Sequence, residues 1–507
     1  MNKKLIIPAA VLILVLAAAF ILLRGPLDTG QATPSPPASA VAAPSKAAAA
    51  TPVATTSQDI SLSILPSKPP KYIFIMIGDG MGDGQRALAE RYAEYKGDKT
   101  PLVMNTLPLS GTVTTRSLNA DITDSAAAAT AYATGHKTDN GMLSVMPDGQ
   151  SLKTVIEEAE EKGLSTGLVT TTTLSNATPA AFASHTESRA LEADIALQYL
   201  DSGVDFFAGG GDKYFLPSSY SGGFDVTGAP LASSRGDGRD LVSEFEQAGY
   251  KTFIGRQGAQ DFTAYVPLAG DKVLASFAND YMPYELDRIN DRFPAPSLAD
   301  MTQKAIETLK GDEDGFALMI EGGRIDHTCA ANDPAGTVNE TLAFNDAVQQ
   351  AYDFYTQHPE ETLLIVVGDH ETGGLKLGDD LDLSHIAGVK LSVTERLHVF
   401  YTGDRQAYYA YLAANLGLDD LNPSEKQRIE DALDFADSAD YKGEYRDSPA
   451  SVVAAILSKR IGVEWAGKDH TGVPVPLYAV GPDADAFSGD KDNTEIGQLL
   501  FDVLRDG

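Results

Sequence analysis

The sequence predicts an α/β fold, with a central, mostly parallel sheet, helices on both faces and a mainly helical insertion. Two observations support this fold class. Near-continuous apolar runs recur along the chain, and runs of that length are typical of buried parallel strands. Stretches with helical character lie between these runs, and such alternation indicates a sheet covered by helices on both faces.

The elements follow one another along 507 residues, a length that allows one large α/β domain or two to three smaller ones. The expected strands are residues 71–80, 163–173, 315–323, 362–370 and 473–482, and the clearest expected helices are residues 151–163 and 337–355. Residues 381–465 lack strand-like runs. In that region Asn422 before Pro423, and Ser448 before Pro449, are typical of helix N-termini, so it is the expected helical insertion.

The N-terminal region predicts a membrane attachment. Residues 5–23 are apolar and uncharged, between Lys3 and Lys4 on one side and Arg24 on the other. At about 1.5 Å per residue, the run nearly spans a hydrocarbon core of roughly 30 Å. We interpret residues 1–24 as an uncleaved signal anchor, with a cleaved signal peptide as the alternative. Either one places the rest of the chain outside the cytoplasm.

The folded domain is expected to span residues 71–507. Residues 25–70 are rich in Ala, Pro, Ser and Thr and lack the apolar periodicity of a core, so they are expected to form a linker. The net charge of −32 argues against nucleic acid and anionic lipid as partners, because the protein's field repels phosphate polymers. A small phosphorylated substrate remains compatible, since a bound metal inverts the local field.

Three of the predicted strands end in an acid. Asp79, Glu321 and Asp369 hold equivalent places, and His370 follows the third. In open parallel sheets, ligands bind beyond the carboxyl ends of the strands. One such acid is ordinary turn chemistry, but three with the same placement predict a shared metal site.

A second stretch of interest begins at Ser125, which follows Asp124 and precedes four alanines. A helix that starts there would place the Ser125 hydroxyl at an N-terminus, where free N–H groups and the helix dipole favour an anion. Taken alone, the stretch is more simply explained as an N-capped alanine helix.

Together, six motifs in order resemble alkaline phosphatases, the phosphomonoesterases that use two zinc ions and one magnesium ion. The motifs are IGDGMG (77–82), TDSAAAATA (123–131), ATPAAFASHTESR (177–189), EGGRID (321–326), DHETGG (369–374) and HTGVPVP (470–476). The resemblance runs from about Lys71 to the C-terminus and is thinnest over residues 381–460. It implies an alkaline-phosphatase-like fold.

The resemblance also implies roles for the matching residues. Ser125 would be the nucleophile that becomes a phosphoserine, and Arg189 would hold two phosphate oxygens, a bidentate task that suits a guanidinium. The other matches are metal ligands. They are Asp79, Asp369, His370 and the Ser125 oxygen for one zinc, Asp326 and His470 for the second zinc, and Asp79, Thr178 and Glu321 for magnesium.

Two positions depart from the family pattern. Asn176 stands where the family has Asp or His, and a neutral side chain there would alter magnesium binding or its pH dependence. Ala330 stands where the family places a zinc-binding histidine, four residues after Asp326. Cys329, one helical turn from Asp326, is a candidate replacement, and His327 is a poorer one. The simpler alternative is that Cys329 is a packed residue and water takes the vacant position.

The resemblance implies hydrolysis of small and varied phosphate monoesters, phosphate scavenging outside the cytoplasm, and a homodimer. Two alternatives remain. Ala330 could mark a degenerate, non-catalytic protein that binds phosphate or metal, and a phosphodiesterase of the same superfamily is the other possibility, although Arg189 favours a monoester. A sulfatase is disfavoured because Ser125 is followed by alanines and not by the x-Pro-x-Arg setting.

Overall fold

The computed structural model describes residues 69–290 and 295–505, all of which belong to the unit Ile64–Gly507. The expected anchor at residues 5–23, and nearly all of the expected linker at 25–70, lie outside these ranges. Among the helices within them, none is both long and apolar enough to cross a membrane.

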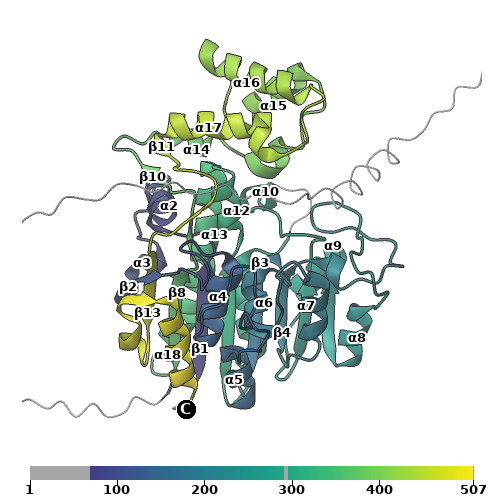
Figure 1. The fold of residues 1–507 in the computed structure, drawn as a ribbon, viewed down its shortest axis with the longest axis vertical. Coiled ribbons are helices and arrows are strands. Elements are labelled where there is room, and N and C mark those ends of the chain that lie inside the picture. The colour runs from purple at the N-terminus through teal and green to yellow at the C-terminus, as the bar shows by residue number, and fades with distance from the viewer. Residues whose placement is uncertain (1–68, 291–294, 506–507) are drawn as a thin grey trace, which may run out of the picture. The chain divides into compact units, whose positions relative to one another are not determined.

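A ten-stranded sheet forms the centre of the fold (Figure 1). Across the sheet the strands are arranged in the order β14-β2-β13-β8-β1-β7-β3-β4-β6-β5. Their bounds are β1 (Tyr72–Gly78), β2 (Leu109–Thr114), β3 (Ser165–Thr173), β4 (Phe206–Gly210), β5 (Tyr250–Ile254), β6 (Lys272–Ser276), β7 (Phe316–Gly322), β8 (Thr362–Gly368), β13 (Val475–Val480) and β14 (Gly489–Asp492). Every residue of the central strands β1, β7 and β8 is buried, which explains why these strands are the clearest apolar runs.

One strand of this sheet, β13, is antiparallel to both of its neighbours, β8 and β2, whereas the other pairs are parallel. The expectation of a parallel strand at residues 473–482 is therefore wrong. An apolar run indicates that a strand is buried, but it does not indicate whether the strand is parallel or antiparallel to its neighbours. The preceding β12 (His470–Thr471) pairs with β9 (Glu371–Thr372), just beyond the carboxyl end of β8, so the chain re-enters the sheet from that edge and runs the opposite way.

Helices cover both faces because strand side chains alternate between them. In β1, Ile73 and Ile77 join one apolar cluster, and Phe74 and Met76 join the other. The first cluster draws on α4 (Ser125–Thr134), α5 (Val155–Glu161), α6 (Ala177–Ala183), α7 (Glu192–Tyr199), α8 (Leu241–Gln247) and α18 (Asn493–Arg505). The second draws on α2 (Asp83–Tyr95), α3 (Val103–Thr106), α9 (Gly255–Ala264), α11 (Leu298–Leu309), α12 (Arg324–Ala330) and α13 (Pro334–Gln357). This arrangement confirms the predicted fold class.

The insertion between β8 and β13 is mainly helical (Figure 1). Its apolar side chains form a cluster that also includes Leu88, Leu286, Ala335 and Val338 from outside the insertion, and the short strands β10 (Lys376–Leu377) and β11 (Val463–Glu464) pair at its base. As expected, the side chains of Asn422 and Ser448 cap its two longest helices. Its helical elements are α14 (Ser384–Ala387), a π-helical turn (Val393–Leu397), α15 (Arg405–Leu416), α16 (Pro423–Ala436) and α17 (Pro449–Ile461), and α10 (Glu285–Arg288) precedes α11 elsewhere in the chain.

Candidate metal centre

The candidate site forms where three central strands end. β1 pairs in parallel and in register with both β7 and β8, so their carboxyl ends reach the same edge of the sheet. Asp79 and Asp369 directly follow β1 and β8, and Glu321 is the last residue but one of β7. All three side chains are buried, so their charges lie in a low-dielectric interior and need compensating partners.

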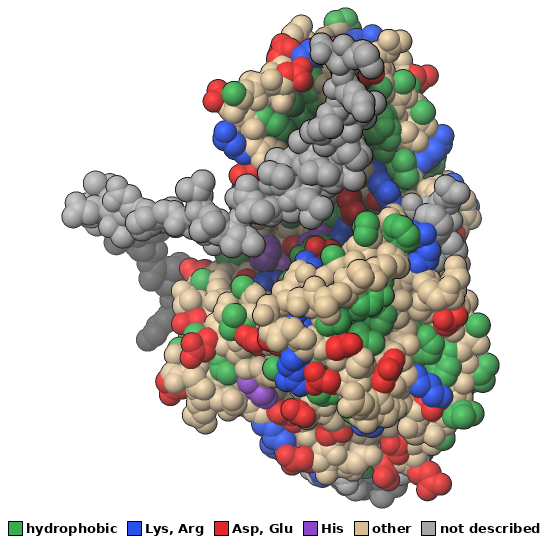
Figure 2. Space-filling view, turned by 90° about the vertical axis from the view of Figure 1, so that its right-hand side faces the viewer, with side chains coloured by type: hydrophobic (Ala, Val, Ile, Leu, Met, Phe, Trp, Pro, Cys, Tyr) green, Lys and Arg blue, Asp and Glu red, His purple; other side chains and the backbone are tan. Residues whose placement is uncertain are grey.

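Two groups of side chains that could bind a metal ion lie at this edge. Asp79, Asp369 and His370 form one, and Asp326, His370 and His470 form the other, with ligand atoms within 4.8 Å of one another in each group. The imidazole rings of His370 and His470 stack with their centroids 3.6 Å apart. On the face drawn in Figure 2, histidine, acidic and basic side chains gather in a hollow between the upper and lower parts of the described chain.

His370 is held in the form that binds a metal. Its Nε2 lies 3.4 Å from Asp79 Oδ1 and 3.3 Å from Asp369 Oδ2. On the other side of the ring, Nδ1 lies 3.2 Å from the hydroxyl of Thr372, which itself donates to Asp326 Oδ1 at 2.5 Å. Because that hydroxyl has only one proton to give, it must accept from Nδ1–H, which leaves the Nε2 lone pair free. Burial and His470 also lower the pKa of His370 to about 3, so the ring is neutral.

Several buried oxygen atoms at the centre meet no hydrogen-bond partner among the described residues. They are Asp79 Oδ1, Asp369 Oδ2, Glu321 Oε1 and Thr178 Oγ1. Burial raises the pKa of Asp369 and of Glu321 to about 7, and burial together with Asp369 raises that of Asp79 well above its ordinary range. Buried, mutually repelling carboxylates with free oxygens are costly. Divalent cations would supply the missing partners, so this donor set of carboxylate oxygens, a hydroxyl and imidazoles fits zinc and magnesium.

Ser125 is the first residue of α4, whose residues are all buried. The Asp124 side chain caps the helix by accepting the N–H of Ala127 at 3.0 Å. At the other end, the Tyr132 hydroxyl donates to the carbonyl of Gly368, the last residue of β8, at 2.6 Å. The helix is thereby fastened to the strand that leads to Asp369, and Ser125 Oγ comes to lie 3.3 Å from His370 Nε2.

Arg189 reaches the same place from the loop after α6. Its Nη1 lies 3.1 Å from Asp124 Oδ2, and its Nη2 donates to Asn176 Oδ1 at 3.2 Å. The same Asn176 oxygen caps α6 by accepting the N–H of Ala177. Asn176 therefore contacts the arginine, where the sequence suggested only an influence on magnesium.

Cys329 and His327, the two candidate replacement ligands near Ala330, lie in different surroundings. Cys329 is fully buried with its sulfur 3.6 Å from the Thr337 hydroxyl of α13, and burial raises the pKa of its thiol. This placement favours the packing interpretation over a replacement ligand. His327 stacks on Tyr281 with ring centroids 4.6 Å apart, and burial lowers its pKa to about 4. Neither residue joins a ligand group, and Ala330 offers no ligand atom.

Some residues of the site were not singled out from the sequence. Asp124 pairs with Arg189, Thr372 orients His370, and the hydroxyls of Thr170 and Thr172 donate to Glu321 Oε2. Asp124 and Thr372 lie inside the quoted motifs and could have been found from their neighbours. The two threonines carried only the signal of a polar run at the end of a predicted strand.

Comparisons with known proteins identify the family. The family model for alkaline phosphatase matches residues 70–505. Alkaline phosphatase 3 of Bacillus subtilis (strain 168) is 34% identical over 452 residues, covering 86% of this chain and 89% of that protein. The repressible alkaline phosphatase of Saccharomyces cerevisiae is 30% identical, covering 86% and 82%.

Solved structures show the same fold. A cold-active alkaline phosphatase from Shewanella sp. superposes with a TM-score of 0.71 at 31% identity, over 85% of this chain and 99% of that one. The alkaline phosphatase of Thermus thermophilus gives a TM-score of 0.73 at 28% identity, over 88% and 95%. The chain therefore belongs to the alkaline phosphatase family, and it is a metal-binding phosphomonoesterase.

Proposed function

We propose that the chain hydrolyses phosphate monoesters through a covalent phosphoserine on Ser125, in a centre of two zinc ions and one magnesium ion. The position of Ser125 carries this proposal. Its hydroxyl oxygen lies 3.3 Å from His370 Nε2, the nitrogen that also faces Asp79 and Asp369. A hydroxyl at a helix N-terminus and beside a metal cluster has what a nucleophile in phosphoryl transfer needs.

The ligands divide among the three ions as the family resemblance suggests. The proposed sets are Asp79, Asp369 and His370 for one zinc, Asp326 and His470 for the second zinc, and Asp79, Thr178 and Glu321 for magnesium. The two groups of ligating side chains and the four unpartnered oxygens support this division. Bound ions would lower the pKa of the Ser125 hydroxyl, neutralise phosphoryl charge and stabilise the leaving oxygen.

The chain's own residues then carry the substrate through two displacements. Arg189 binds two phosphate oxygens, and Asp124 and Asn176 aim its guanidinium. Ser125 Oγ attacks phosphorus and gives its proton to solvent, while the bond between phosphorus and the alcohol oxygen breaks and that oxygen takes a proton from solvent to leave as the alcohol. Water then cleaves the phosphoserine, which releases inorganic phosphate and restores the hydroxyl.

Substitution of Ala330 tests this proposal. With Ala330, only Asp326 and His470 remain for the second zinc, apart from the shared His370, so zinc should bind weakly there. We expect Ala330→His to raise the zinc content towards two per chain, and to raise turnover of a chromogenic monoester at limiting zinc by at least about tenfold. Ala330→Gln, which fills similar space without an imidazole, is the matched control.

Each result decides between alternatives. Two zinc ions in each chain, with equal turnover, would mean that Cys329 or water completes the second zinc site and that Ala330 is a tolerated variant. No turnover by either chain would favour the non-catalytic phosphate- or metal-binding alternative. Faster cleavage of a phosphodiester than of a monoester would favour the phosphodiesterase alternative. Loss of phosphoryl incorporation in Ser125→Ala should accompany loss of turnover if Ser125 is the nucleophile.

We also propose that the enzyme works outside the cytoplasm, as a membrane-anchored or exported homodimer that scavenges phosphate from small monoesters. The support for this location is the apolar run at residues 5–23 with Lys3 and Lys4 before it. Fractionation of cells that produce the full chain, with and without residues 1–24, tests the location, and light scattering tests the dimer.

A further inference from the structure

A buried carboxylate that the proposed mechanism does not use holds the turn that follows β8. Glu371 is 4% exposed, and four groups donate hydrogen bonds to it. Its Oε1 accepts from Gln85 Nε2 at 2.8 Å, from the Gly374 N–H at 2.9 Å and from the Leu375 N–H at 3.2 Å, and its Oε2 accepts from the Thr471 hydroxyl at 2.5 Å. Because both oxygens are engaged by the protein, Glu371 serves to fix the turn.

Gln85 ties the same turn to the start of α2. Its side chain is fully buried, and its Nε2 donates to Glu371 Oε1 and to the main-chain carbonyl of Thr372, both at 2.8 Å. Its Oε1 accepts the Gly82 N–H at 3.1 Å. A Cβ at Gly82 would lie 2.4 Å from Glu371 Cγ, so glycine is needed there for α2 to approach the carboxylate this closely.

Thr372 links this hydrogen-bonded turn to two of the candidate metal ligands. Its hydroxyl donates to Asp326 Oδ1 at 2.5 Å and lies 3.2 Å from His370 Nδ1. Its main-chain carbonyl is the one that Gln85 holds. A shift of the main chain at Thr372 would therefore move the hydroxyl that orients both ligands.

Thr471 links the turn to a third ligand. It precedes no long strand, since β12 and β9 pair over only two residues, and a ladder that short is too weak to fix a strand alone. The bond from the Thr471 hydroxyl to Glu371 adds a side-chain contact beside His470. His470 Nδ1 lies 2.9 Å from the Thr123 carbonyl, which can only accept, so Nδ1 carries the proton and Nε2, 3.5 Å from Asp326 Oδ1, is free to bind a metal.

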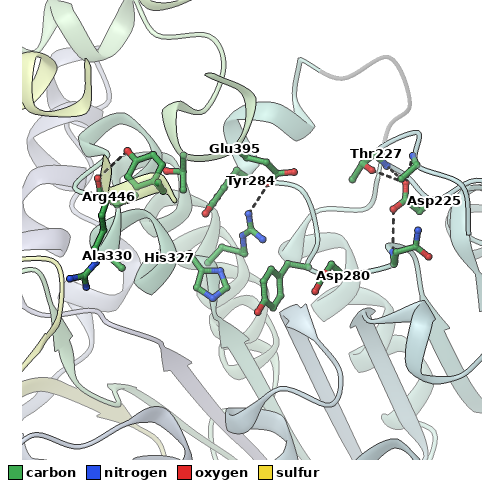
Figure 3. A pocket seen from close by; sticks show the side chains of 15 residues that line it. Asp225, Thr227, Asp280, Tyr284, His327, Ala330, Glu395 and Arg446 are labelled. Carbon is green, nitrogen blue, oxygen red and sulfur yellow. Dashed lines mark hydrogen bonds and ion pairs between the residues drawn. The ribbon is translucent and has the colours of Figure 1, made fainter. Parts of the chain in front are cut away.

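The alanine at position 330 makes this arrangement important. The group of Asp326, His370 and His470 gains no ligand atom from Ala330, whose short side chain is drawn in Figure 3. With one ligand fewer than the family pattern, more of the binding free energy depends on holding the remaining three in place before the ion binds.

We propose that Glu371 and Gln85 are positioning residues for the second zinc site. They hold Thr372 and Thr471, and these two threonines hold the ligands. This inference rests on the proposed centre of two zinc ions. Glu371 and Gln85 are not themselves ligands, and outer partners of this kind contribute about ten- to hundredfold to metal affinity.

The test measures zinc binding by the full chain, in competition with a chromophoric chelator. We expect Glu371→Ala to raise the Kd of the more weakly bound zinc by at least about tenfold, with a smaller change for the tighter one. Glu371→Gln should stay within about twofold of the parent chain, because its amide oxygen still accepts from Gln85 and its amide N–H can donate to the Thr471 hydroxyl oxygen. Thr471→Val removes only the hydroxyl and should raise the same Kd by about threefold.

Asp225→Ala is the matched control. Asp225 is 3% exposed, and its carboxylate also accepts several main-chain donors, the N–H groups of Thr227, Ala229 and Asn279. Figure 3 shows it across the view from Ala330. The control should lower Tm, as Glu371→Ala does, but leave both zinc Kd values unchanged. In protein loaded with Co²⁺ instead of zinc, the visible absorption bands should change in Glu371→Ala and not in the control, since these bands depend on ligand geometry.

The outcomes separate this inference from the function on which it rests. Zinc Kd values in Glu371→Ala equal to those of the parent chain would overturn it and leave the phosphatase intact. An equal loss of zinc affinity in Asp225→Ala would also overturn it, because the effect would then follow from stability alone. Should Glu371→Ala fail to fold, an unchanged Kd in Thr471→Val would overturn it.

The same comparison is made in Ala330→His if the parent chain binds its second zinc too weakly to measure. Absence of a second zinc from both the parent chain and Ala330→His would overturn the proposed two-zinc centre itself. That result is distinct from a second zinc that binds equally well with and without Glu371.

Discussion

Two histidines on neighbouring elements show how the environment of a single residue decides its chemistry. His370 lies among carboxylates and a hydroxyl, which leave its Nε2 free to bind a cation. His327 lies against Tyr281 and beside the charge of Arg324, so it has no ligand group to join. The imidazoles are identical, and only the first has partners that would hold a metal.

A substitution at Asn176 should affect both substrate binding and protein stability. We expect Asn176→Ala to raise KM for a monoester about three- to tenfold, because Arg189 loses one of the two side chains that aim it. The same change removes the cap of α6, which should lower the free energy of unfolding by about 1 kcal/mol. Steady-state kinetics and chemical denaturation measure the two effects.

Asn422→Ala is the matched control for that change. Asn422 caps α16 in the insertion by accepting the N–H of Glu425 at 3.0 Å, and its side chain has no contact with Arg189. It should lose similar stability with KM unchanged. If both variants shift KM equally, the effect of Asn176 is structural and the proposed aiming of Arg189 is wrong.

At the scale of elements, the sequence predicts the strands that appear as long apolar runs and the helices that begin after a capping residue. The five expected runs correspond to β1, β3, β7, β8 and β13, and the caps Asp124, Asn422 and Ser448 begin α4, α16 and α17. The strands β2, β4, β5, β6 and β14 were not predicted, because they are only four to six residues long and give too short a pattern to be recognised in the sequence.

The candidate site could likewise be predicted only in part. Acids at strand ends can be predicted, since parallel strands end at a common edge. The pairing of Arg189 with Asp124 and Asn176 could not be predicted from residue types, because it depends on how α4 and α6 pack together. The orientation of Cys329 towards α13 likewise depends on the fold and not on its position one turn from Asp326.

The contact between α18 and α4 tests how firmly the nucleophile's helix is placed. A Cβ at Gly497 of α18 would lie 2.5 Å from the Ala131 carbonyl oxygen of α4 and 2.5 Å from the amide nitrogen of Gly135, the C-cap of α4. We expect Gly497→Ala to lower the free energy of unfolding by about 1–3 kcal/mol through overpacking. It should also lower kcat, because a shift of α4 moves Ser125 at its first turn.

Thermal denaturation and steady-state kinetics give both readouts for this variant. Gly236→Ala is the control, since a Cβ there would meet no atom within 4 Å. A Gly497→Ala protein that matches the control in Tm and kcat would show that the two helices separate without cost. A loss of Tm with kcat unchanged would show that Ser125 is positioned independently of the α18 contact.

At the scale of the whole molecule, the metal centre is a concentration of negative charge inside an already acidic protein. The chain carries a net charge of −32, and Asp79, Glu321 and Asp369 meet inside it with free oxygens. Without cations, these carboxylates repel one another in a low-dielectric interior. Bound cations are therefore expected to stabilise the fold as well as to serve the reaction.

This dependence predicts how the effect of a chelator changes with pH. In the metal-free protein the pKa of Asp369 and of Glu321 is about 7, above the value of about 4 that these groups have when unfolded. Between these values the folded state binds more protons than the unfolded state, so the stability of the metal-free form falls as pH rises. Bound cations hold the same carboxylates ionised, so the metal-loaded form does not lose this stability as pH rises.

The Tm difference between metal-loaded and EDTA-treated protein should therefore grow from about pH 5 to about pH 7 and then level off. Glu321→Gln removes one of the titrating groups and should reduce this growth. A Tm difference that stays constant or shrinks over that range would show that these carboxylates do not bind the cations.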